Sequence, residues 1–322
     1  MKTGDMTLLM RRIVCASLLS LLAAGACAQA PTLRILVPFP AGGVTDLAAR
    51  TLAERLAPAL GQTVIVENRP GGGSRIGTDA AIKAAPDGQT LLFTNTSYAI
   101  LPIVDPTVKI EADKSMLPVG MLASYGLAFA ISNSIPAKSL SEFVAHARSR
   151  PGKLSYGSSG PGSGTHFLGE YFKSLTGTFI VHIPYRSTAG ALNDVAGGTL
   201  DMTFDATAKA YADAGKVRVL AVTGAHRDPR MPTVPTAAEA GLKDFVIVSW
   251  VGLLAPVGTP EASLARLNAA LNEALAAPAL RQRLQEMGLT PEGGDRQRML
   301  RQIREDVRLH RQIAERAQLR FE

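Results

Sequence analysis

Apolar residues in the first third of the chain alternate between short continuous runs and stripes with helical spacing. The run from Leu33 to Phe39 is typical of a strand buried in a parallel sheet. Leu47, Ala48, Leu52 and Leu56 then recur on one face of a helix. The same pattern predicts further strands at 63–67 and 90–94, and helices at 45–60 and 76–85. This β-α-β-α-β order predicts parallel strands joined by right-handed crossovers.

A second series of α/β units begins at Leu154, after a predicted strand at 121–131 and a helix at 139–148. An apolar segment at 246–256 is long enough to cross between domains. The other expected elements are strands at 154–157, 179–183, 202–204 and 217–222, and helices at 165–175, 190–195, 260–276, 278–287 and 295–319. Because ligands in open α/β sheets bind beyond the carboxyl ends of the strands, two such halves predict an α/β protein with a central cleft.

The N-terminal segment has the layout of a secretory signal peptide. Lys2, Arg11 and Arg12 precede an apolar run at 13–26 that is shorter than a membrane-spanning helix needs. Ala26-Cys27-Ala28 predicts cleavage before Gln29, so residues 1–28 are the expected signal peptide. A lipid on Cys27 is the alternative. Both cysteines, Cys15 and Cys27, leave with the segment, which excludes a disulfide or a cysteine metal site in the mature chain.

The first predicted strand runs through Gly42–Gly43 into a helix whose first turn contains Asp46. Such a turn exposes backbone N–H groups beside a helix N-terminus, where the macrodipole favours an anion. We expect Gly43 to allow close backbone approach and to permit a positive φ. Loss of Lys2, Arg11, Arg12 and Asp5 with the signal peptide changes the formal charge from +7 to +5. A basic mature protein suits anionic small molecules, although a basic surface also occurs without any ligand.

Signatures of common enzymes are absent from the sequence. There is no G-x-S-x-G elbow, S-x-x-K, G-x-G-x-x-G or phosphate-binding P-loop. The five histidines lack metal-ligand spacing, so neither a metal nor a cofactor is expected. A catalytic triad assembled from distant residues would leave no local signature, and Ser159 and Ser163 are its candidate nucleophiles. A periplasmic serine hydrolase is therefore the runner-up hypothesis.

Nine motifs, spread in order over the mature chain, resemble those of the Bug-type solute receptors of the tripartite tricarboxylate transporters. They are Val37–Asp46, Glu67–Gly73, Ile76–Thr78, Pro86–Leu92, Pro151–Gly160, His182–Arg186, Leu220–Thr223, Val234–Glu239 and Trp250–Pro256. The resemblance implies a type II periplasmic binding protein, a two-domain "Venus flytrap" that captures a small carboxylated or related polar solute. It further implies a discontinuous domain 1 at 29–130 and 252–322, a domain 2 at 131–251, and a hinge near Ile131 and Trp250.

The resemblance also implies a set of ligand-binding residues. The first clamp, which would grip one end of the ligand through main-chain groups and ordered waters, comprises Phe39, Pro40, Ala41, Gly42, Gly43, Val44, Thr45 and Asp46. Asp46 is anionic, so helix capping is its expected role rather than direct contact with a carboxylate. The opposing clamp comprises Ser158, Ser159, Gly162, Ser163 and His166. The remaining candidates are Thr96 and Ser97, Tyr185 and Arg186, and Asp205 at the cleft floor.

Some of these positions have structural alternatives. Arg186 could pair with a carboxylate in bidentate fashion or be a solvated surface arginine. Thr96 and Ser97 could select the ligand or cap a connection. Ser74, Arg75, Ser187 and Gly190 depart from the family pattern.

The arginine-rich C-terminal helix could suggest a nucleic-acid site. Apolar residues at Leu300, Ile303, Val307 and Ala314 line one face, however, and acidic residues interleave with the cations. This pattern favours a solvated amphipathic helix packed on the body, with no nucleic-acid partner. The expected function is a monomeric periplasmic receptor, without enzyme activity, that delivers solute to membrane permease subunits. A receptor that signals to a sensor is the third hypothesis.

Overall fold

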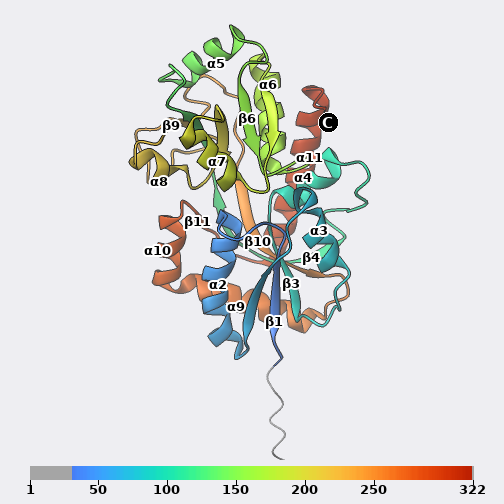
Figure 1. The fold of residues 1–322 in the computed structure, drawn as a ribbon. Coiled ribbons are helices and arrows are strands. Elements are labelled where there is room, and N and C mark those ends of the chain that lie inside the picture. Colours follow the sequence, from blue (N-terminus) through green and yellow to red (C-terminus); the bar gives the residue numbers. More distant parts are fainter. Residues whose placement is uncertain (1–30, 321–322) are drawn as a thin grey trace, which may run out of the picture. The chain divides into compact units, whose positions relative to one another are not determined.

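Two β-sheets organise the part of the chain that the computed structural model describes, residues 31–320 (Figure 1). The predicted signal peptide, residues 1–28, and both cysteines lie outside the described residues. Within residues 31–320, no helix has both the length and the apolar character needed to cross a membrane.

The first sheet has the order β11-β4-β10-β3-β1-β2. Its strands β1, β2 and β3 are parallel, as the sequence predicts, while β10 is antiparallel to both of its neighbours. The strands are β1 (Leu33–Val37), β2 (Val64–Asn68), β3 (Thr90–Asn95), β4 (Met116–Tyr125), β10 (Ser249–Pro256) and β11 (Thr290–Pro291). We call this sheet with its helices the first lobe.

The second sheet repeats this plan, with the order β7-β6-β8-β5-β9. Three parallel strands are again followed by one antiparallel strand, β5, that enters from the other sheet. Its strands are β5 (Ala128–Ser132), β6 (Ser155–Ser158), β7 (Val181–Pro184), β8 (Met202–Asp205) and β9 (Val217–Val222). We call this sheet with its helices the second lobe.

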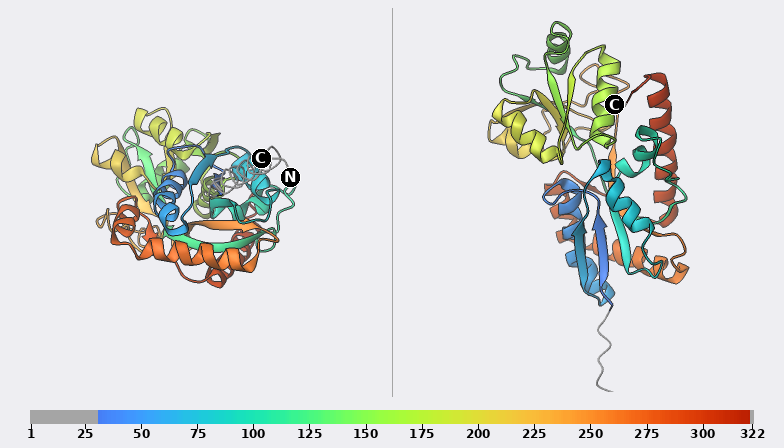
Figure 2. Two further views of the ribbon diagram at one scale, coloured as in Figure 1. Left: turned by 90° about the horizontal axis from the view of Figure 1, so that it is seen from below. Right: turned by 45° about the vertical axis from the view of Figure 1, so that its right-hand side comes forward.

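Helices cover both sheets, and most of them follow a parallel strand directly (Figures 1 and 2). In the first lobe they are α2 (Val44–Leu60), the 3₁₀ turn η1 (Gly72–Ser74), α3 (Arg75–Ile82), α4 (Ser97–Val104), α9 (Glu261–Ala276), α10 (Pro278–Glu286) and α11 (Arg296–Arg316). In the second lobe they are α5 (Leu140–Arg148), α6 (Gly164–Thr176), α7 (Thr188–Gly197) and α8 (Ala208–Asp213).

Neighbouring strand residues serve opposite faces of the first sheet. Ile35 belongs to the core beneath α2 and α9, whereas Leu36 belongs to the core beneath α3 and α11. The second lobe has an aromatic core in which Phe129 meets Phe143, Phe172 and Phe204 with ring centroids 5.0–5.2 Å apart. Burying both faces explains why these strands are continuous apolar runs rather than alternating ones.

Two local expectations from the sequence were wrong, and two helices were missed. The apolar stretch at 121–131 is two strands, because Gly126–Leu127 breaks the pairing where the chain passes from the first sheet to the second. The helices α4 and α8 follow strands in segments that no strong helical stripe had marked. In α11 the buried stripe is Met299, Ile303, Asp306 and His310, a register that includes two polar residues.

The two crossings between the lobes lie side by side. The first is at Gly126–Leu127, and the second comes between Val222 and Ser249. Thr223 ties them together, since its hydroxyl accepts from the Leu127 N–H at 3.0 Å and donates to the Ile247 carbonyl at 2.8 Å. The predicted boundaries at 130/131 and 251/252 fall near these crossings, and the division into domains stays a prediction.

Candidate functional site

A cavity of about 80 Å³ lies between the lobes, beyond the carboxyl ends of the parallel strands. Because one water needs ~10–15 Å³ of such volume, the cavity has room for several waters or for a compact solute in their place. The first lobe contributes Phe39, Pro40, Gly43, Val44, Thr45, Asn95, Thr96 and Ser97 to its wall. The second lobe contributes Ser159, Gly164, Thr165, Ser187, Thr188 and Ala206. The remaining wall is largely apolar and consists of Ile100, Tyr125, Leu127, Phe167, Leu168, Ile247, Ser249 and His310.

Four helices begin at the wall of this cavity. Val44, Ser97, Gly164 and Thr188 are the first residues of α2, α4, α6 and α7, and all four line it. The first turn of a helix has N–H groups without intrahelical partners and the positive end of the macrodipole. Two of these N–H groups are already bonded, that of Ser97 to Asn95 and that of Gly164 to the Ser97 hydroxyl. Of residues 31–320, none of those that line the cavity is Asp, Glu, Lys or Arg. The field of the cavity therefore comes from helix N-termini of both lobes and favours an anion.

The loop after β1 is held in place by Asp46, which is buried and does not line the cavity. Its carboxylate accepts hydrogen bonds from the Gly42 N–H at 2.9 Å, from Arg50 at 3.0 Å and from Asn68 at 2.8 Å. Burial opposes ionisation of Asp46, but these hydrogen bonds outweigh it and hold its pKa below the usual value. The carboxylate thus fixes the turn before α2. The predicted helix capping is wrong, because the N–H that it accepts from, that of Gly42, precedes the helix. Gly42, with φ of 86°, takes the positive φ expected at Gly43, whose φ is −78°.

Asn95 joins the loops that follow β1 and β3. Its amide donates to the Thr45 hydroxyl at 3.0 Å, and its carbonyl oxygen accepts from the Ser97 N–H at 2.9 Å. Sequence reasoning missed Asn95, although its place at the end of a buried strand is a signal that could have found it. Of the predicted residues in this region, Thr96 and Ser97 line the cavity, and Ala41 and Gly42 do not.

In the loop after β6, several predicted ligand residues support the loop itself. Ser158 and Ser163 have no exposed surface. The Ser158 hydroxyl lies 2.6 Å from Nε2 of His182, and the Ser163 hydroxyl donates to the Gly160 carbonyl at 2.7 Å while capping α6. The residues of this loop that reach the cavity are Ser159, Gly164 and Thr165.

His166 lies behind the same loop rather than in the cavity. Its ring stacks on that of His182 with centroids 4.1 Å apart, and its Nδ1 accepts from the Gly162 N–H at 3.2 Å. Burial, reinforced by the nearby His182, lowers the pKa of His166 to about 4. The imidazole is therefore neutral at neutral pH and adds no positive charge to the site.

Gly162, Tyr185 and Arg186 line a wider groove outside the cavity. This groove shares Phe39, Pro40 and Ser159 with the cavity, so the two are continuous. Asp205 lines neither of them, because its carboxylate accepts from the Thr207 N–H at 2.6 Å and from the Thr207 hydroxyl at 2.5 Å. Among residues 31–320, no cluster of three His, Cys, Asp or Glu is placed to hold a metal ion.

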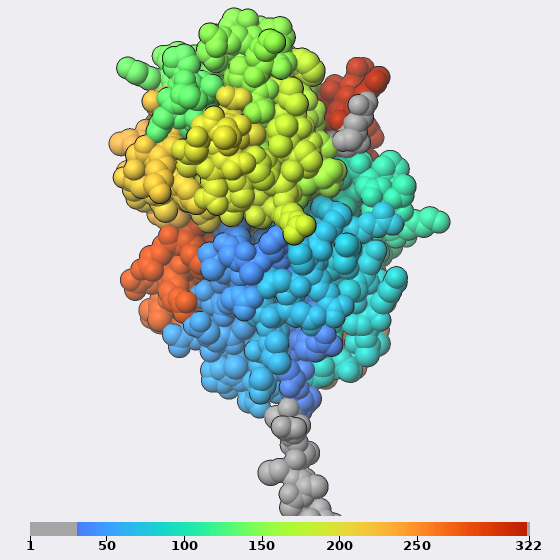
Figure 3. All heavy atoms as spheres, in the orientation of Figure 1, coloured from blue at the N-terminus to red at the C-terminus, as the bar shows by residue number. Residues whose placement is uncertain are grey.

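The lobes touch at both sides of the cleft. At one side the Gly164 N–H donates to the Ser97 hydroxyl at 3.1 Å, so the starts of α6 and α4 meet directly. Figure 3 shows the first lobe (blue) and the second lobe (yellow-green) in contact along one face of the molecule. We call this arrangement, with the lobes in contact across the cleft, the closed form.

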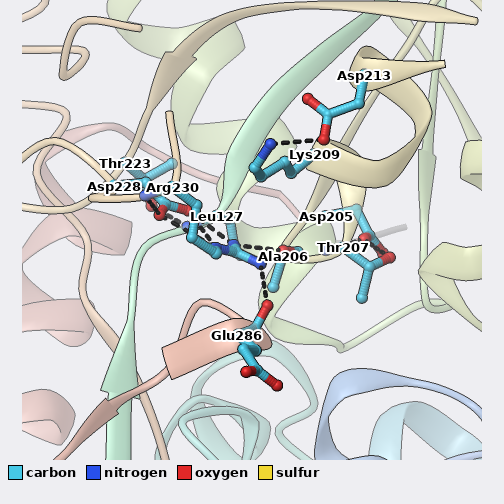
Figure 4. Close-up of polar contacts among 10 residues, drawn as sticks. All are labelled: Leu127, Asp205, Ala206, Thr207, Lys209, Asp213, Thr223, Asp228, Arg230 and Glu286. Atoms are coloured by element: carbon cyan, nitrogen blue, oxygen red, sulfur yellow. Dashed lines mark hydrogen bonds and ion pairs between the residues drawn. The ribbon is translucent and has the colours of Figure 1, made fainter. Parts of the chain in front are cut away.

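At the other side of the cleft, Arg230 of the second lobe reaches the first (Figure 4). Its guanidinium donates to the main-chain carbonyls of Ala206 at 3.2 Å and Glu286 at 3.3 Å. Asp228 holds the guanidinium by a bidentate pair, with the shortest N–O distance 2.7 Å. Glu286 is the last residue of α10, where the macrodipole is negative. Arg230 therefore gives the C-terminal end of this helix, in the opposite lobe, a hydrogen-bond donor and a positive charge.

Replacing Arg230 by methionine is expected to weaken solute binding about tenfold, or about 1.4 kcal/mol, because the lost bond to Glu286 exists only in the closed form. Calorimetry gives the affinity, and small-angle scattering of the unliganded protein should show a larger radius than the wild type. The matched control is Arg227→Met, which removes an exposed pair with Glu239 within the second lobe. Equal affinities of the two variants would contradict a role in closure.

A family model described as the tripartite tricarboxylate transporter family receptor matches residues 48–319. The chain belongs to this family. Among its relatives, BugT of Bordetella pertussis is 35% identical over 263 residues, which cover 80% of this chain and 81% of BugT. The resemblance seen in the sequence motifs is confirmed.

Similarity to solved structures agrees with membership of this family. The periplasmic binding protein BugD has a TM-score of 0.86 at 30% identity, with 90% of this chain and 99% of that chain covered. MatC from Rhodopseudomonas palustris, with bound malate, has a TM-score of 0.84 at 31% identity, with 88% and 98% covered. The two-domain α/β fold of the periplasmic binding proteins is thus confirmed, and the chain is a solute-binding receptor of the family.

Proposed function

We propose that this receptor binds a compact carboxylate in the cavity between its lobes, without converting it. The observation that carries the proposal is the convergence of four helix N-termini, from both lobes, on a cavity to which the described part of the chain contributes no Asp, Glu, Lys or Arg. A carboxylate there gains N–H donors and favourable dipoles. Because only the closed form offers contacts from both lobes, the solute stabilises closure through that difference in energy. The malate found in MatC supports a ligand of this chemical class.

In this proposal the signal peptide at 1–28 directs the chain to the periplasm, where a monomer passes its solute to the transporter's membrane permease. Domain 1 at 29–130 and 252–322 and domain 2 at 131–251 are the two moving bodies. The polar residues that line the cavity, chiefly Thr45, Ser97 and Ser159, contact the solute beside the helix N-termini. Arg186, in the outer groove, stands where a longer anion would extend.

The contacts of the candidate serines support binding over hydrolysis. The Ser159 hydroxyl lies 3.1 Å from the hydroxyl of Thr165, which is not a general base. Ser163 is fully buried and caps α6. Ser158 does lie against a histidine, His182, but it also has no exposed surface at which a substrate could be attacked.

Thermal unfolding across a panel of mono- and dicarboxylates tests the proposal. A cognate carboxylate at 100 times its Kd stabilises the folded state by about 2.7 kcal/mol, which raises Tm by several °C. The control for each acid is its neutral carboxamide, which has nearly the same shape and should leave Tm unchanged. Stabilisation by carboxamides or cations, with none by carboxylates, would contradict the proposal.

A further inference from the structure

His310 brings an unusual polar group to the apolar part of the cavity. It comes from α11, the C-terminal helix, which runs alongside both lobes in Figure 2. The side chain is 1% exposed and lines the cavity with Ile100 and Phe167. Its ring meets that of Phe167 edge-on, with centroids 5.0 Å apart. A buried imidazole in such surroundings needs a hydrogen-bond partner for each nitrogen.

One ring nitrogen of His310 has its partner within the helix. Nδ1 lies 2.7 Å from the main-chain carbonyl of Asp306, and a carbonyl oxygen can only accept, so Nδ1 carries the proton. In the neutral ring Nε2 is then an acceptor. Burial lowers the pKa of His310 to about 4, so this neutral form holds at neutral pH. Within residues 31–320, Nε2 is buried and has no hydrogen-bond partner.

The side chains around the cavity narrow the choice of a donor for Nε2. Ile100 and Phe167, which belong to the same part of the wall, carry no side-chain donor group. The hydroxyls of Tyr125 and Ser249 in this wall bond to each other, and neither bonds to Nε2. An ammonium group on the solute would be buried without an anionic partner, since no Asp or Glu in the described range 31–320 lines the cavity, and such burial is unfavourable. A hydroxyl group donates one hydrogen bond without carrying a charge into the apolar wall.

We propose that the solute is a hydroxylated carboxylate whose hydroxyl group donates a hydrogen bond to Nε2 of His310. The hydroxyl lies on the part of the molecule that faces Ile100 and Phe167, while the carboxylate faces the helix N-termini. The inference rests on the proposed function, because it assigns a second feature to the same solute. His310 is then a specificity-determining residue that selects among compact acids.

Binding of matched acid pairs to the wild type and to His310→Leu tests the inference by calorimetry. The pairs are malate and succinate, 3-hydroxybutyrate and butyrate, and 4-hydroxybenzoate and benzoate. In the pair that binds most tightly, the wild type should prefer the hydroxylated acid at least tenfold, and His310→Leu should reduce this preference to within twofold. His310→Gln keeps an acceptor in the side chain, so it should retain part of the preference. It replaces the leucine variant if that variant does not fold.

Two results would overturn the inference while leaving the proposed function intact. One is binding of acids with no preference for a hydroxyl group in any pair, which would mean that a water satisfies Nε2. The other is a preference that His310→Leu leaves unchanged, which would place the hydroxyl elsewhere in the cavity. Failure of every acid in the panel to bind would instead reject the proposed function, and the inference with it.

Discussion

Replacing Gly43 by valine is expected to reduce solute affinity by at least about 100-fold, or about 2.7 kcal/mol, while leaving the fold nearly intact. A Cβ at Gly43 would meet one atom within 4 Å, the Pro40 carbonyl oxygen at 3.9 Å, so the valine side chain would project into the cavity that the residue lines. The backbone at Gly43, with φ of −78° and ψ of 164°, suits valine. Loss of a tolerated N-cap residue from α2 costs about 1 kcal/mol.

Calorimetry and thermal unfolding of this variant should be compared with those of Gly197→Val. A Cβ at Gly197 would likewise have open space around it, with nothing within 4 Å, but this residue ends α7 away from the cavity. That control should keep wild-type affinity. A folded Gly43→Val protein that binds as tightly as the wild type would remove the loop after β1 from the site.

Replacing Gly73 by alanine is expected to hold the cleft open. A Cβ at Gly73, in the first lobe, would lie 2.6 Å from the Pro161 carbonyl oxygen and 2.9 Å from the Gly162 carbonyl carbon in the second. These are main-chain atoms, so relief requires the lobes to move apart. Because apparent affinity falls in proportion to the closed population, we expect a loss of about 10- to 100-fold. Small-angle scattering at saturating solute should show a larger radius than the wild type.

The matched control for backbone strain is Gly61→Ala. Gly61 and Gly73 have the same φ of 62°, so alanine is disfavoured to a similar degree at both. Nothing lies within 4 Å of a Cβ at Gly61, which ends α2. Both variants should therefore lose similar stability, while only Gly73→Ala loses affinity. Equal affinities would show that the approach of Gly73 to Pro161 plays no part in binding.

The loop after β1 could be predicted from sequence because its signals are local. A buried strand, the pair Gly42–Gly43 and an acidic residue in the next helical turn lie within a few positions of one another. Each has a physical reason that needs no distant partner, and the structure places Gly43 and Thr45 at the cavity.

In the loop after β6, the sequence could not predict which polar side chains point into the cavity. Ser158, Ser163 and His166 have the chemistry expected of ligand contacts, but their hydrogen bonds go to groups of the second lobe itself. The residues of this region that line the cavity, Gly164 and Thr165, belong instead to the helix that Ser163 caps. Residue type alone does not tell whether a serine supports a loop or points out of it.

Contacts between distant segments account for the remaining differences. His310 reaches the cavity because α11 packs with Met299, Ile303 and Asp306 inward, whereas the apolar pattern favoured the face of Leu300. Asp306 and His310 share the face of Met299 and Ile303, and two polar residues on an apolar face were the available signal of a buried polar site, since buried polar groups need partners. The antiparallel β10 was also missed, because β-α-β alternation carries no information about a strand that returns from the other lobe.

A crystal structure of the protein with its tightest-binding carboxylate tests the central claim most directly. We expect closed lobes around the solute, with carboxylate oxygens about 2.7–3.2 Å from main-chain N–H groups at the starts of α2, α6 or α7. A solute bound outside the cavity, with its carboxylate held by exposed lysine or arginine side chains, would contradict the account.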